Sequence, residues 1–423
     1  MSSLIPALNV RWFVSALSHD DVVQAAARIG SGVLTTPCVP SPELSDRLGC
    51  SIWLKLEYLQ RTGSFKERGA CNALLLLDPA VRARGVIAAS AGNHALALAY
   101  HGRRLQVPVT VVMPRFAPLI KQSRCQALGA EVVLAGDTIA EAKHEADRIL
   151  RERGLSYVHG FDGPAVIAGQ GTIGLEILAQ CPEVDAIVAP IGGGGLIAGL
   201  ALALDGWSRP VELLGVEPAR AASYSAAVAA GRPVPIAMQP TLADGLAVPE
   251  VGANAFAIAR GAVSAVAAVE ESSLAVAVLR LAELEKGVVE GAGAAPLAAM
   301  LEGKFPGLAG RNVVLVLCGG NIDPAVLSRI IEFGLVADGR LVQFVAVISD
   351  RPGGLAEFAA TVASVGASIK EVEHDRLFGS ADISRVRVLC RVEVRDLAHR
   401  NRLFAALRGT GIEVLEQGGP GSA

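Results

Sequence analysis

The stretch that decides the fold is AIVAPIGGGGLIAGLALAL, residues 186–204, which carries no charge between Asp185 and Asp205. It is nominally long enough to cross a bilayer, because about 20 apolar residues suffice. Pro190 and the four glycines 192–195 in its middle would make a poor continuous helix. We therefore expect a buried strand, a glycine turn and a helix here, and no membrane span.

The same rhythm of strand, small-residue turn and helix repeats from about residue 52 to residue 330. Expected strands are 85–90, 109–113, 131–134, 186–191, 211–216 and 312–318, and expected helices include one beginning near 95 and those at 120–128 and 140–153. Alternation of this kind predicts an α/β domain with a parallel sheet. Ligands of such sheets bind at the carboxyl ends of the strands.

The pattern changes after about Asp338. Expected strands are 341–349, 368–374, 386–395 and 412–416, with one helix ending near 365 and another over 396–408. The order is βαββαβ, which predicts a separate small module with its own core. We therefore expect a catalytic domain over residues 1–337 and a second domain over 338–423.

Composition limits the class of protein. Of 423 residues, 52% are hydrophobic, 19% are charged and 46 are glycine, which suits folded α/β layers. A net charge of −3 without a basic tail argues against nucleic-acid binding. The seven cysteines are scattered and form no Cys-x-x-Cys pair, and the N-terminus lacks a secretory pattern. We expect a cytoplasmic protein with neither a nucleic-acid nor a membrane partner.

A lysine stands inside the segment TGSFKERG, residues 62–69. Ser64 and Glu67 have the spacing of a capping box at the start of a helix. Lys66 then falls in the first turn, where the helix dipole disfavours its charged form. A lysine of lowered pKa can form a Schiff base, although the segment alone fits a surface lysine better.

The segment AASAGNHA, residues 88–95, reads as a strand-to-helix turn whose backbone N–H groups could hold a carboxylate. An ordinary tight turn explains it equally well. We do not expect His94 to bind a metal, because no second ligand lies at suitable spacing.

Residues 191–196, IGGGGL, could wrap a phosphate at the start of a helix. The alternative is a dinucleotide site, since Gly193-x-Gly195-x-x-Ala198 is followed by Glu217 at the end of the next strand. That pattern alone favours an NAD-dependent oxidoreductase. In VLCGGN, residues 316–321, Cys318 is either a small core residue or a strand-end residue that faces a ligand.

Together these segments resemble the fold-type II pyridoxal-phosphate enzymes, a two-lobed fold like that of tryptophan synthase β. They are most similar to the threonine dehydratase (threonine ammonia-lyase) group. The segments that carry the resemblance are LKLEYLQRTGSFKERGA (54–70), SAGNH (90–94), GGGGL (192–196) and CGGN (318–321). The resemblance implies a small lobe over about 54–158, inserted in the large lobe. The tail resembles an ACT regulatory domain, with DRPGGL at 350–355 as its first turn.

The resemblance also implies roles for individual residues. Lys66 would be the catalytic residue and would hold pyridoxal 5'-phosphate covalently. The other cofactor-binding residues would be Phe65 beside the ring, Asn93 at the 3-hydroxyl, Gly192, Gly193, Gly194, Gly195 and Leu196 at the phosphate, and Cys318 at the pyridine nitrogen. The substrate carboxylate would be surrounded by Ser90, Ala91, Gly92, Asn93 and His94.

The implied reaction is β-elimination of L-threonine to 2-oxobutanoate and ammonia, and of L-serine to pyruvate. A neutral Cys318 would not protonate the ring, which favours prompt loss of the hydroxyl over reprotonation. Ala91 stands where serine racemases carry a serine base, which favours elimination over racemisation. The alternatives are a serine racemase, a dehydratase of another β-hydroxy amino acid, an NAD-dependent oxidoreductase, and a non-catalytic amino-acid sensor.

Two further sites follow from the resemblance. The cation site of some relatives falls on Glu217 and Ala221, but Ser223 replaces its aspartate, so we expect at most a monovalent ion. A branched-chain amino-acid effector would bind at the turn of the tail, at Asp350, Gly353, Gly354 and Leu355. Such an allosteric enzyme would suit isoleucine biosynthesis, whereas a ligand-free tail would serve dimerisation. We expect a homo-oligomer, a dimer or a tetramer.

Overall fold

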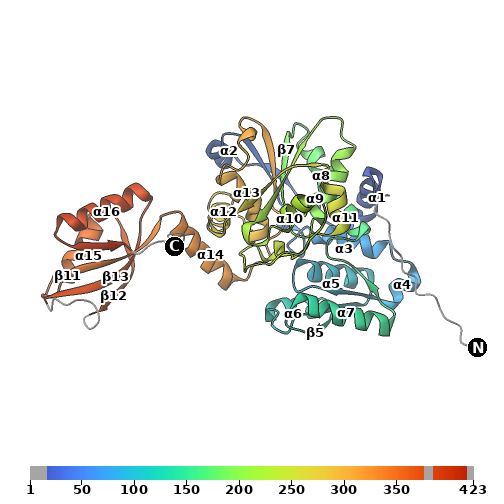
Figure 1. The fold of residues 1–423 in the computed structure, drawn as a ribbon, viewed down its shortest axis with the longest axis horizontal. Helices are drawn as coiled ribbons and strands as arrows, with labels where there is room; N and C mark the ends of the chain where they lie inside the picture. The colour runs from blue at the N-terminus through green and yellow to red at the C-terminus, as the bar shows by residue number, and fades with distance from the viewer. Residues whose placement is uncertain (1–16, 376–383, 417–423) are drawn as a thin grey trace, which may run out of the picture. The chain divides into compact units, whose positions relative to one another are not determined.

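The computed structural model describes residues 17–375 and 384–416 (Figure 1). Within them the chain divides into two compact units. The first runs to Glu271 and resumes over Leu284–Asp323, and the second comprises Ser272–Glu283 and the chain from Pro324 onward. The predicted division into domains after residue 337 stays a prediction.

A six-stranded sheet forms the large lobe of the first unit, in the order β1-β2-β10-β7-β8-β9. All neighbours are parallel except β1 and β2. The strands are β1 (Cys38–Pro40), β2 (Ser51–Lys55), β7 (Ala186–Pro190), β8 (Glu212–Pro218), β9 (Val263–Val269) and β10 (Asn312–Val316). The helices are α1 (His19–Ile29), α2 (Pro42–Leu48), α3 (Lys66–Leu75), α8 (Pro164–Gln180), α9 (Gly195–Asp205), α10 (Ser223–Ala230), α11 (Ala253–Ala259) and α13 (Gly291–Leu301).

The uncharged stretch 186–204 forms a strand, a turn and a helix, as predicted. Every residue of β7 is buried, and β7 lies between β10 and β8. α9 begins at Gly195 and packs on this sheet. No helix in the described part of the chain is both long and apolar enough to span a bilayer.

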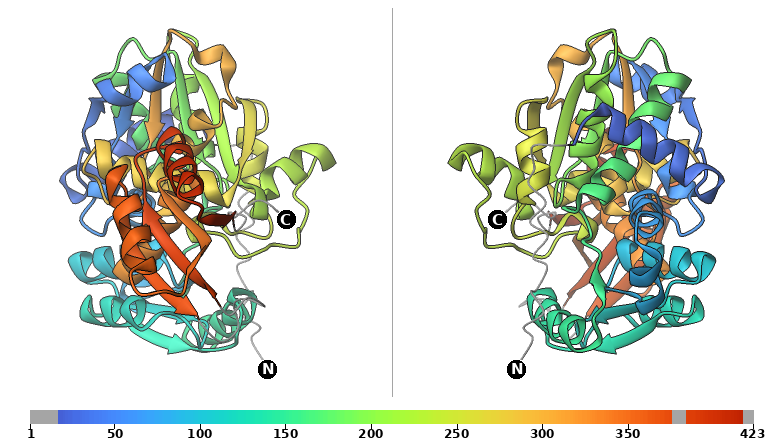
Figure 2. Two further views of the ribbon diagram at one scale, coloured as in Figure 1. Left: turned by 90° about the vertical axis from the view of Figure 1, so that its left-hand side faces the viewer. Right: turned by 90° about the vertical axis from the view of Figure 1, so that its right-hand side faces the viewer.

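The small lobe has its own parallel sheet, in the order β5-β4-β3-β6 (Figure 2, teal). Its strands are β3 (Val86–Ala89), β4 (Val109–Met113), β5 (Glu131–Leu134) and β6 (Ser156–Tyr157), and its helices are α4 (Pro79–Arg84), α5 (Asn93–Leu105), α6 (Leu119–Ala127) and α7 (Ile139–Arg153). Ile87 packs in the cluster with α7, and its neighbour Ala88 packs in the cluster with α5. Adjacent strand residues therefore supply opposite faces, as a sheet covered on both sides requires.

The predicted capping box at the start of α3 is wrong. Phe65, which precedes the helix, already has helical backbone angles, whereas an N-cap residue is normally extended. The hydroxyl of Ser64 has no hydrogen-bond partner within the described residues, and Glu67 accepts from the backbone N–H of Thr62. The Phe65 N–H donates to the Cys318 carbonyl at 3.0 Å, so the strand-end segment after β10 holds this backbone in place.

The second unit contains a four-stranded antiparallel sheet in the order β12-β13-β11-β14. Its elements are α12 (Glu271–Leu284, of which Ser272–Glu283 belong to this unit), α14 (Pro324–Ala337), β11 (Leu341–Ser349), α15 (Gly354–Ser364), β12 (Ser368–Asp375), β13 (Arg385–Glu393), α16 (Leu397–Gly409) and β14 (Glu413–Glu416). The elements from β11 onward confirm the predicted βαββαβ order. A separate core joins Phe344 of the sheet to Phe358 of α15 and Phe404 of α16.

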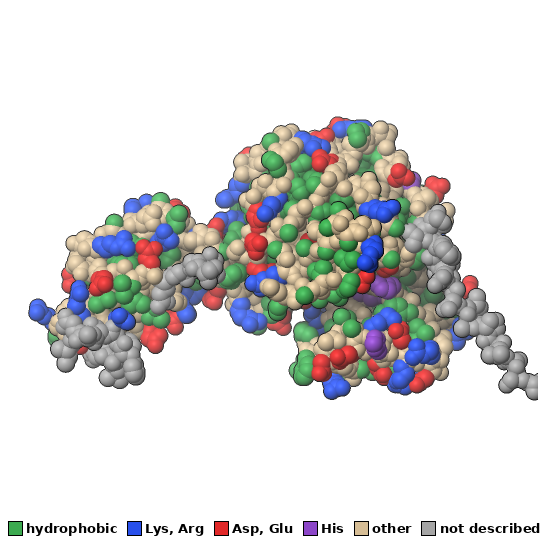
Figure 3. Space-filling view, viewed as in Figure 1, with side chains coloured by type: hydrophobic (Ala, Val, Ile, Leu, Met, Phe, Trp, Pro, Cys, Tyr) green, Lys and Arg blue, Asp and Glu red, His purple; other side chains and the backbone are tan. Residues whose placement is uncertain are grey.

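Basic and acidic side chains are intermixed on the face shown in Figure 3. This agrees with the small net charge of the whole chain.

Candidate active site

A cavity of about 540 Å³ in the first unit collects residues from both of its lobes. The turns that follow β3, β7 and β10 all reach it, as expected for the carboxyl ends of parallel strands. Every residue predicted to act in catalysis, cofactor binding or substrate binding lines it: Phe65, Lys66, Ser90, Ala91, Gly92, Asn93, His94, Gly192, Gly193, Gly194, Gly195, Leu196 and Cys318.

Lys66 is the first residue of α3 and faces this cavity. Its Nζ donates to the Gly160 carbonyl at 2.7 Å and lies 5.0 Å from the centre of the Phe65 ring. Burial lowers the pKa of Lys66 to about 8, against the opposing effect of Cys318 and Glu290. A larger share of this amine is therefore neutral near pH 7 than for an ordinary lysine, as a nucleophile or base requires.

Two imidazoles near Lys66 stay uncharged at neutral pH. Burial and the nearby Lys66 lower the pKa of His94 to about 3, and its Nε2 lies 3.0 Å from the Val158 carbonyl. Since a carbonyl only accepts, Nε2 carries the ring proton. Burial likewise lowers the pKa of His159 to about 4, with Lys66 and Lys143 adding to the effect.

Cys318 also lines the cavity. Burial raises its pKa well above the usual range, and Glu290 adds to this. Cys318 is therefore a neutral thiol at physiological pH, able to offer only a weak hydrogen bond.

The glycine turn 192–195 leaves no room for side chains. A Cβ at Gly195 would lie 2.3 Å from the Phe161 carbonyl oxygen, and one at Gly193 would lie 2.3 Å from the Phe161 ring. Gly194 has a φ of 88°, in the region that favours glycine. The turn brings bare backbone to the N-terminus of α9, where unpaired N–H groups and the helix dipole favour an anion such as phosphate. The turn thus fits a phosphate group.

The alternative dinucleotide pattern is not supported by the position of its acidic residue. Glu217 is fully buried and does not line the cavity. Its carboxylate accepts from the backbone N–H groups of Tyr224 and Ser225 at 2.6 and 2.9 Å, and from the Ser225 hydroxyl at 2.6 Å. Glu217 therefore holds the beginning of α10 and is not placed to bind a ribose.

None of the predicted cation and effector residues lines the cavity. Glu217 lies near the end of β8 and Ala221 ends the 3-10 turn η4 (Ala219–Ala221), and the described residues contain no group of three or more His, Cys, Asp and Glu that could hold a metal. Asp350 and Gly353 lie in the turn between β11 and α15, and Gly354 and Leu355 are the first two residues of α15.

Several ionisable residues of the cavity were not predicted from the sequence, among them Lys121, Lys143, His159, Asp244 and Glu290. Glu290 is 4% exposed, precedes α13, and accepts from the Asn93 Nδ2 at 2.7 Å. Burial raises the pKa of Glu290 to about 8, with nearby Asp244 adding to the effect. One signal could have found it, because Glu290 is the only charged residue between Lys286 and Glu302.

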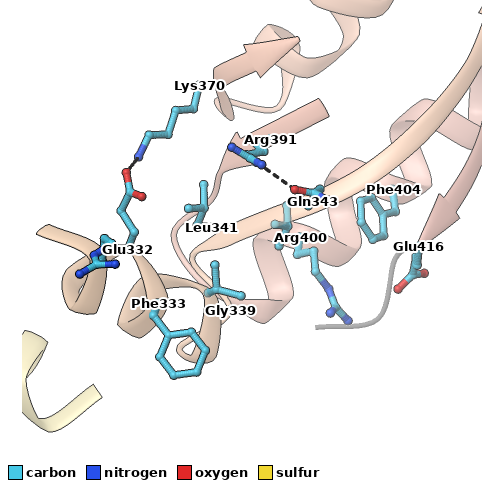
Figure 4. A pocket seen from close by; sticks show the side chains of 13 residues that line it. Glu332, Phe333, Gly339, Leu341, Gln343, Lys370, Arg391, Arg400, Phe404 and Glu416 are labelled. Atoms are coloured by element: carbon cyan, nitrogen blue, oxygen red, sulfur yellow. Dashed lines mark hydrogen bonds and ion pairs between the residues drawn. The ribbon is translucent and has the colours of Figure 1, made fainter. Parts of the chain in front are cut away.

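A second pocket, of about 510 Å³, lies within the second unit (Figure 4). Its wall is made by α14, α16 and the sheet, and it combines six charged side chains with apolar ones that include Phe333 and Phe404. Lys370 donates to Glu332 at 2.8 Å and Arg391 to Gln343 at 2.8 Å. The predicted effector turn at 350–355 does not line this pocket.

Comparison with known proteins agrees with this geometry. Residues 29–319 match the family of pyridoxal-phosphate dependent enzymes, and the chain belongs to that family. It uses pyridoxal phosphate, which the glycine turn and Lys66 fit, and it has the two-lobed fold-type II architecture.

Within this family, the chain is similar to proteins named as threonine ammonia-lyases and threonine deaminases. The chain is 43% identical to the L-threonine ammonia-lyase of Geobacter sulfurreducens, over 95% of this chain and 100% of that one. Among solved structures it resembles the processed form of threonine deaminase isoform 2 from Solanum lycopersicum, with a TM-score of 0.70 and 33% identity over 79% of this chain and 99% of that one. The serine racemase of Dictyostelium discoideum gives a TM-score of 0.69 at 32% identity, over 73% of this chain and 99% of that one.

Proposed function

We propose that the chain is a threonine ammonia-lyase, which converts L-threonine to 2-oxobutanoate and ammonia and L-serine to pyruvate and ammonia. The observation that carries this is the amino group of Lys66, whose pKa is lowered, inside one cavity with the Ser90–His94 turn and the glycine turn. The 43% identity to an L-threonine ammonia-lyase over 95% of the chain supports the substrate.

The cofactor would be held by groups of different chemistry. Lys66 would form the covalent bond through Nζ, the backbone of 192–196 would receive the phosphate, and Asn93 would donate to the phenolic oxygen. Phe65 would contact the ring, and the neutral Cys318 would face the pyridine nitrogen. When bound, pyridoxal phosphate supplies an electron sink for a carbanion at the substrate Cα.

The residues of the chain account for the remaining chemistry. The turn 90–94 lies at the N-terminus of α5, so its backbone N–H groups bind the substrate carboxylate. The substrate amine would displace the Lys66 Nζ, and the freed lysine would take the Cα proton, since its lowered pKa leaves neutral amine available. The hydroxyl leaves Cβ with a proton as water, and the released enamine takes up water and loses ammonia.

Racemisation needs a proton donor on the face of the substrate opposite Lys66. Ala91, at the position of the racemase serine, has no proton to give. His94 does not replace it, because its Nε2 proton is directed to the Val158 carbonyl and its pKa of about 3 keeps the ring neutral. Elimination is therefore favoured over racemisation.

A substrate panel tests the proposal. The holoenzyme should release 2-oxo acid and ammonia in equal amounts from L-threonine and L-serine, and should form no D-serine. Formation of D-serine without pyruvate would instead support a racemase. A turnover of hydroxyaspartate that exceeds that of threonine would move the substrate to another β-hydroxy amino acid.

We also propose that residues 338–423 form an ACT-like regulatory domain that binds a branched-chain amino acid at the 350–355 turn. Gly353 has a φ of 99° and a Cβ added there would meet nothing within 4 Å, so the backbone just before α15 is open to a small ligand. Isothermal titration with isoleucine and valine tests this. Absence of both heat and any kinetic effect would contradict it.

A monovalent cation beside Glu217 and Ala221 is a further proposal. The buried hydroxyl of Ser223 has no hydrogen-bond partner within the described residues, which leaves an oxygen available there. Replacing potassium by a bulky organic cation should lower activity if the site is real.

A homo-oligomer in a reducing cytoplasm completes the proposal. The seven cysteines are all unpaired and buried, as expected in a reducing compartment. Light scattering of the purified protein measures the oligomeric state, and a monomer would contradict this part of the proposal.

A further inference from the structure

A row of four polar side chains leads from the small lobe to the wall of the cavity. Arg124 of α6 donates from Nη1 to the Asn321 Oδ1 at 3.1 Å, and Asn321 donates from Nδ2 to the Asn93 Oδ1 at 2.9 Å. Asn93 in turn donates from Nδ2 to the Glu290 Oε1 at 2.7 Å. Each of the two asparagines thus accepts a hydrogen bond at its oxygen and donates one from its nitrogen.

The direction of this row is fixed at its beginning. The Asn321 Nδ2 also donates to the Thr62 carbonyl, at 2.6 Å. A carbonyl can only accept and a guanidinium can only donate, so the amide of Asn321 has one allowed orientation. With Asn321 reversed, its oxygen would face the Thr62 carbonyl and its N–H groups would face Arg124.

The orientation of Asn93 follows from that of Asn321. The atom of Asn93 that faces the Asn321 N–H must be the oxygen, so the nitrogen of Asn93 faces Glu290. This nitrogen carries two hydrogens, of which Glu290 accepts one. The other has no partner among the described side chains, and Asn93 lies in the cavity wall.

We propose that Glu290 is a positioning residue: as the acceptor at the end of the row Arg124–Asn321–Asn93, it holds the Asn93 amide with its second N–H directed at the phenolic oxygen of the cofactor. This rests on the proposed function, in which Asn93 binds that oxygen. A fixed N–H donor stabilises the phenolate over the phenol.

Only the acceptor oxygen of Glu290 is needed for this role. The raised pKa of Glu290, about 8, makes it a neutral acid at physiological pH. A neutral acid offers one acceptor oxygen and one O–H donor, which a glutamine side chain reproduces with its oxygen and its amide N–H. Glu290→Gln should therefore preserve the orientation of Asn93, whereas Glu290→Ala removes the acceptor.

A second variant breaks the row at another point. Asn321→Asp keeps the shape but removes the N–H donors to Thr62 and to Asn93, and it turns an oxygen toward the Asn93 oxygen. The Asn93 amide then reverses to donate to the new carboxylate. Its oxygen consequently takes the place of the nitrogen beside Glu290.

The experiment measures two properties of the protein with pyridoxal phosphate. One is the affinity of each apoprotein for the cofactor, by absorbance titration, and the other is the share of the shorter-wavelength absorption band, which reports a proton on the phenolic oxygen. Glu290→Ala and Asn321→Asp should weaken affinity about tenfold and enlarge that band, while Glu290→Gln stays near the unmodified protein. Glu271→Gln, at a buried carboxyl outside the cavity, is the matched control and should change neither property.

Three outcomes separate the possibilities. The positioning role is overturned if Glu290→Ala and Asn321→Asp keep affinity and spectrum unchanged while Asn93→Ala loses both. The positioning role is also overturned if Glu290→Gln loses as much affinity for pyridoxal phosphate as Glu290→Ala does. Cofactor binding would then require the charge of Glu290 and not its acceptor oxygen. If Asn93→Ala itself binds the cofactor normally, the proposed role of Asn93 fails instead. Thermal unfolding of each apoprotein identifies any variant that does not fold. If Glu290→Ala or Asn321→Asp fails to fold, the other of the two variants tests the positioning role.

Discussion

The two pockets of this chain have nearly the same volume, about 540 Å³ in the first unit and 510 Å³ in the second. Their walls differ in chemistry. In the first, burial moves the pKa of Lys66 down and that of Glu290 up, both to about 8. In the second, Lys370 and Glu332 are solvated and pair with each other at 2.8 Å (Figure 4).

The two pockets therefore cannot be told apart by volume, and only the chemistry of their walls distinguishes them. In the first pocket, burial disfavours the charged forms of Lys66 and Glu290. The fold therefore holds ionisable groups with shifted pKa values, which are typical of active sites. In the second, the hydrogen bond between Lys370 and Glu332 raises the pKa of the lysine and lowers that of the glutamate, so each charge is favoured. The four predictions that follow test this contrast.

The largest effect is expected at Lys66. Lys66→Ala removes both the covalent attachment and the base, so the rate of 2-oxo acid release should fall by more than about 10³-fold. Lys143→Ala, at another lysine of the same cavity, is the control and should lose much less. An equal loss of rate in both variants would show that Lys66 is not the catalytic lysine.

A smaller but still large effect is expected at the glycine turn. Gly195→Ala places a Cβ 2.3 Å from the Phe161 carbonyl, so the turn must shift, and affinity for pyridoxal phosphate should fall about tenfold or more. Gly261→Ala, where a Cβ would meet nothing within 4 Å, should leave affinity unchanged. Unchanged affinity in Gly195→Ala would remove the turn from the phosphate site.

The pH dependence of cofactor attachment measures the effect of burial on Lys66 directly. Only the neutral amine reacts, so the rate should rise with pH and level off above the pKa of about 8. An ordinary lysine would keep gaining rate up to about 10.5. Stopped-flow absorbance gives the profile, and Glu290→Gln removes the second group that titrates near 8. A profile that still climbs well above pH 8 would show that burial does not lower this pKa.

The smallest effect is expected in the second pocket. Lys370→Ala removes a solvated ion pair, so the free energy of unfolding should change by at most about 1 kcal/mol, with no change in activity. Arg280→Ala breaks the less exposed pair with Asp338, at 2.6 Å, and should cost more. Denaturant unfolding measures both. A marked loss of activity in Lys370→Ala would give the second pocket a functional role.

Much of the fold could be predicted because buried parallel strands read as apolar runs, and β4, β5 and β11 have the predicted bounds. Other elements of the large lobe were not predicted, among them β9 and α13. β9, VSAVAAV, has small side chains in irregular burial and offers no alternation. α13 is apolar on all sides and contains Pro296, so no helical periodicity marks it.

The candidate site likewise contains residues that could be predicted from the sequence and others that could not. Lys66, the 90–94 turn, the glycine turn and Cys318 could be predicted, because each lies in a short segment whose residue types are unusual. Glu290 could not, because its relation to Asn93 spans 197 residues and depends on how the two lobes fold.

The role of Lys66 is tested by identifying the residue that carries the cofactor. Borohydride reduces the Schiff base of the holoprotein to a stable amine, and mass spectrometry of its peptides then identifies the labelled lysine. The pyridoxyl group is expected on Lys66. Three lysines line the cavity, so a label on Lys121 or Lys143 in its place would show that Lys66 does not hold the cofactor.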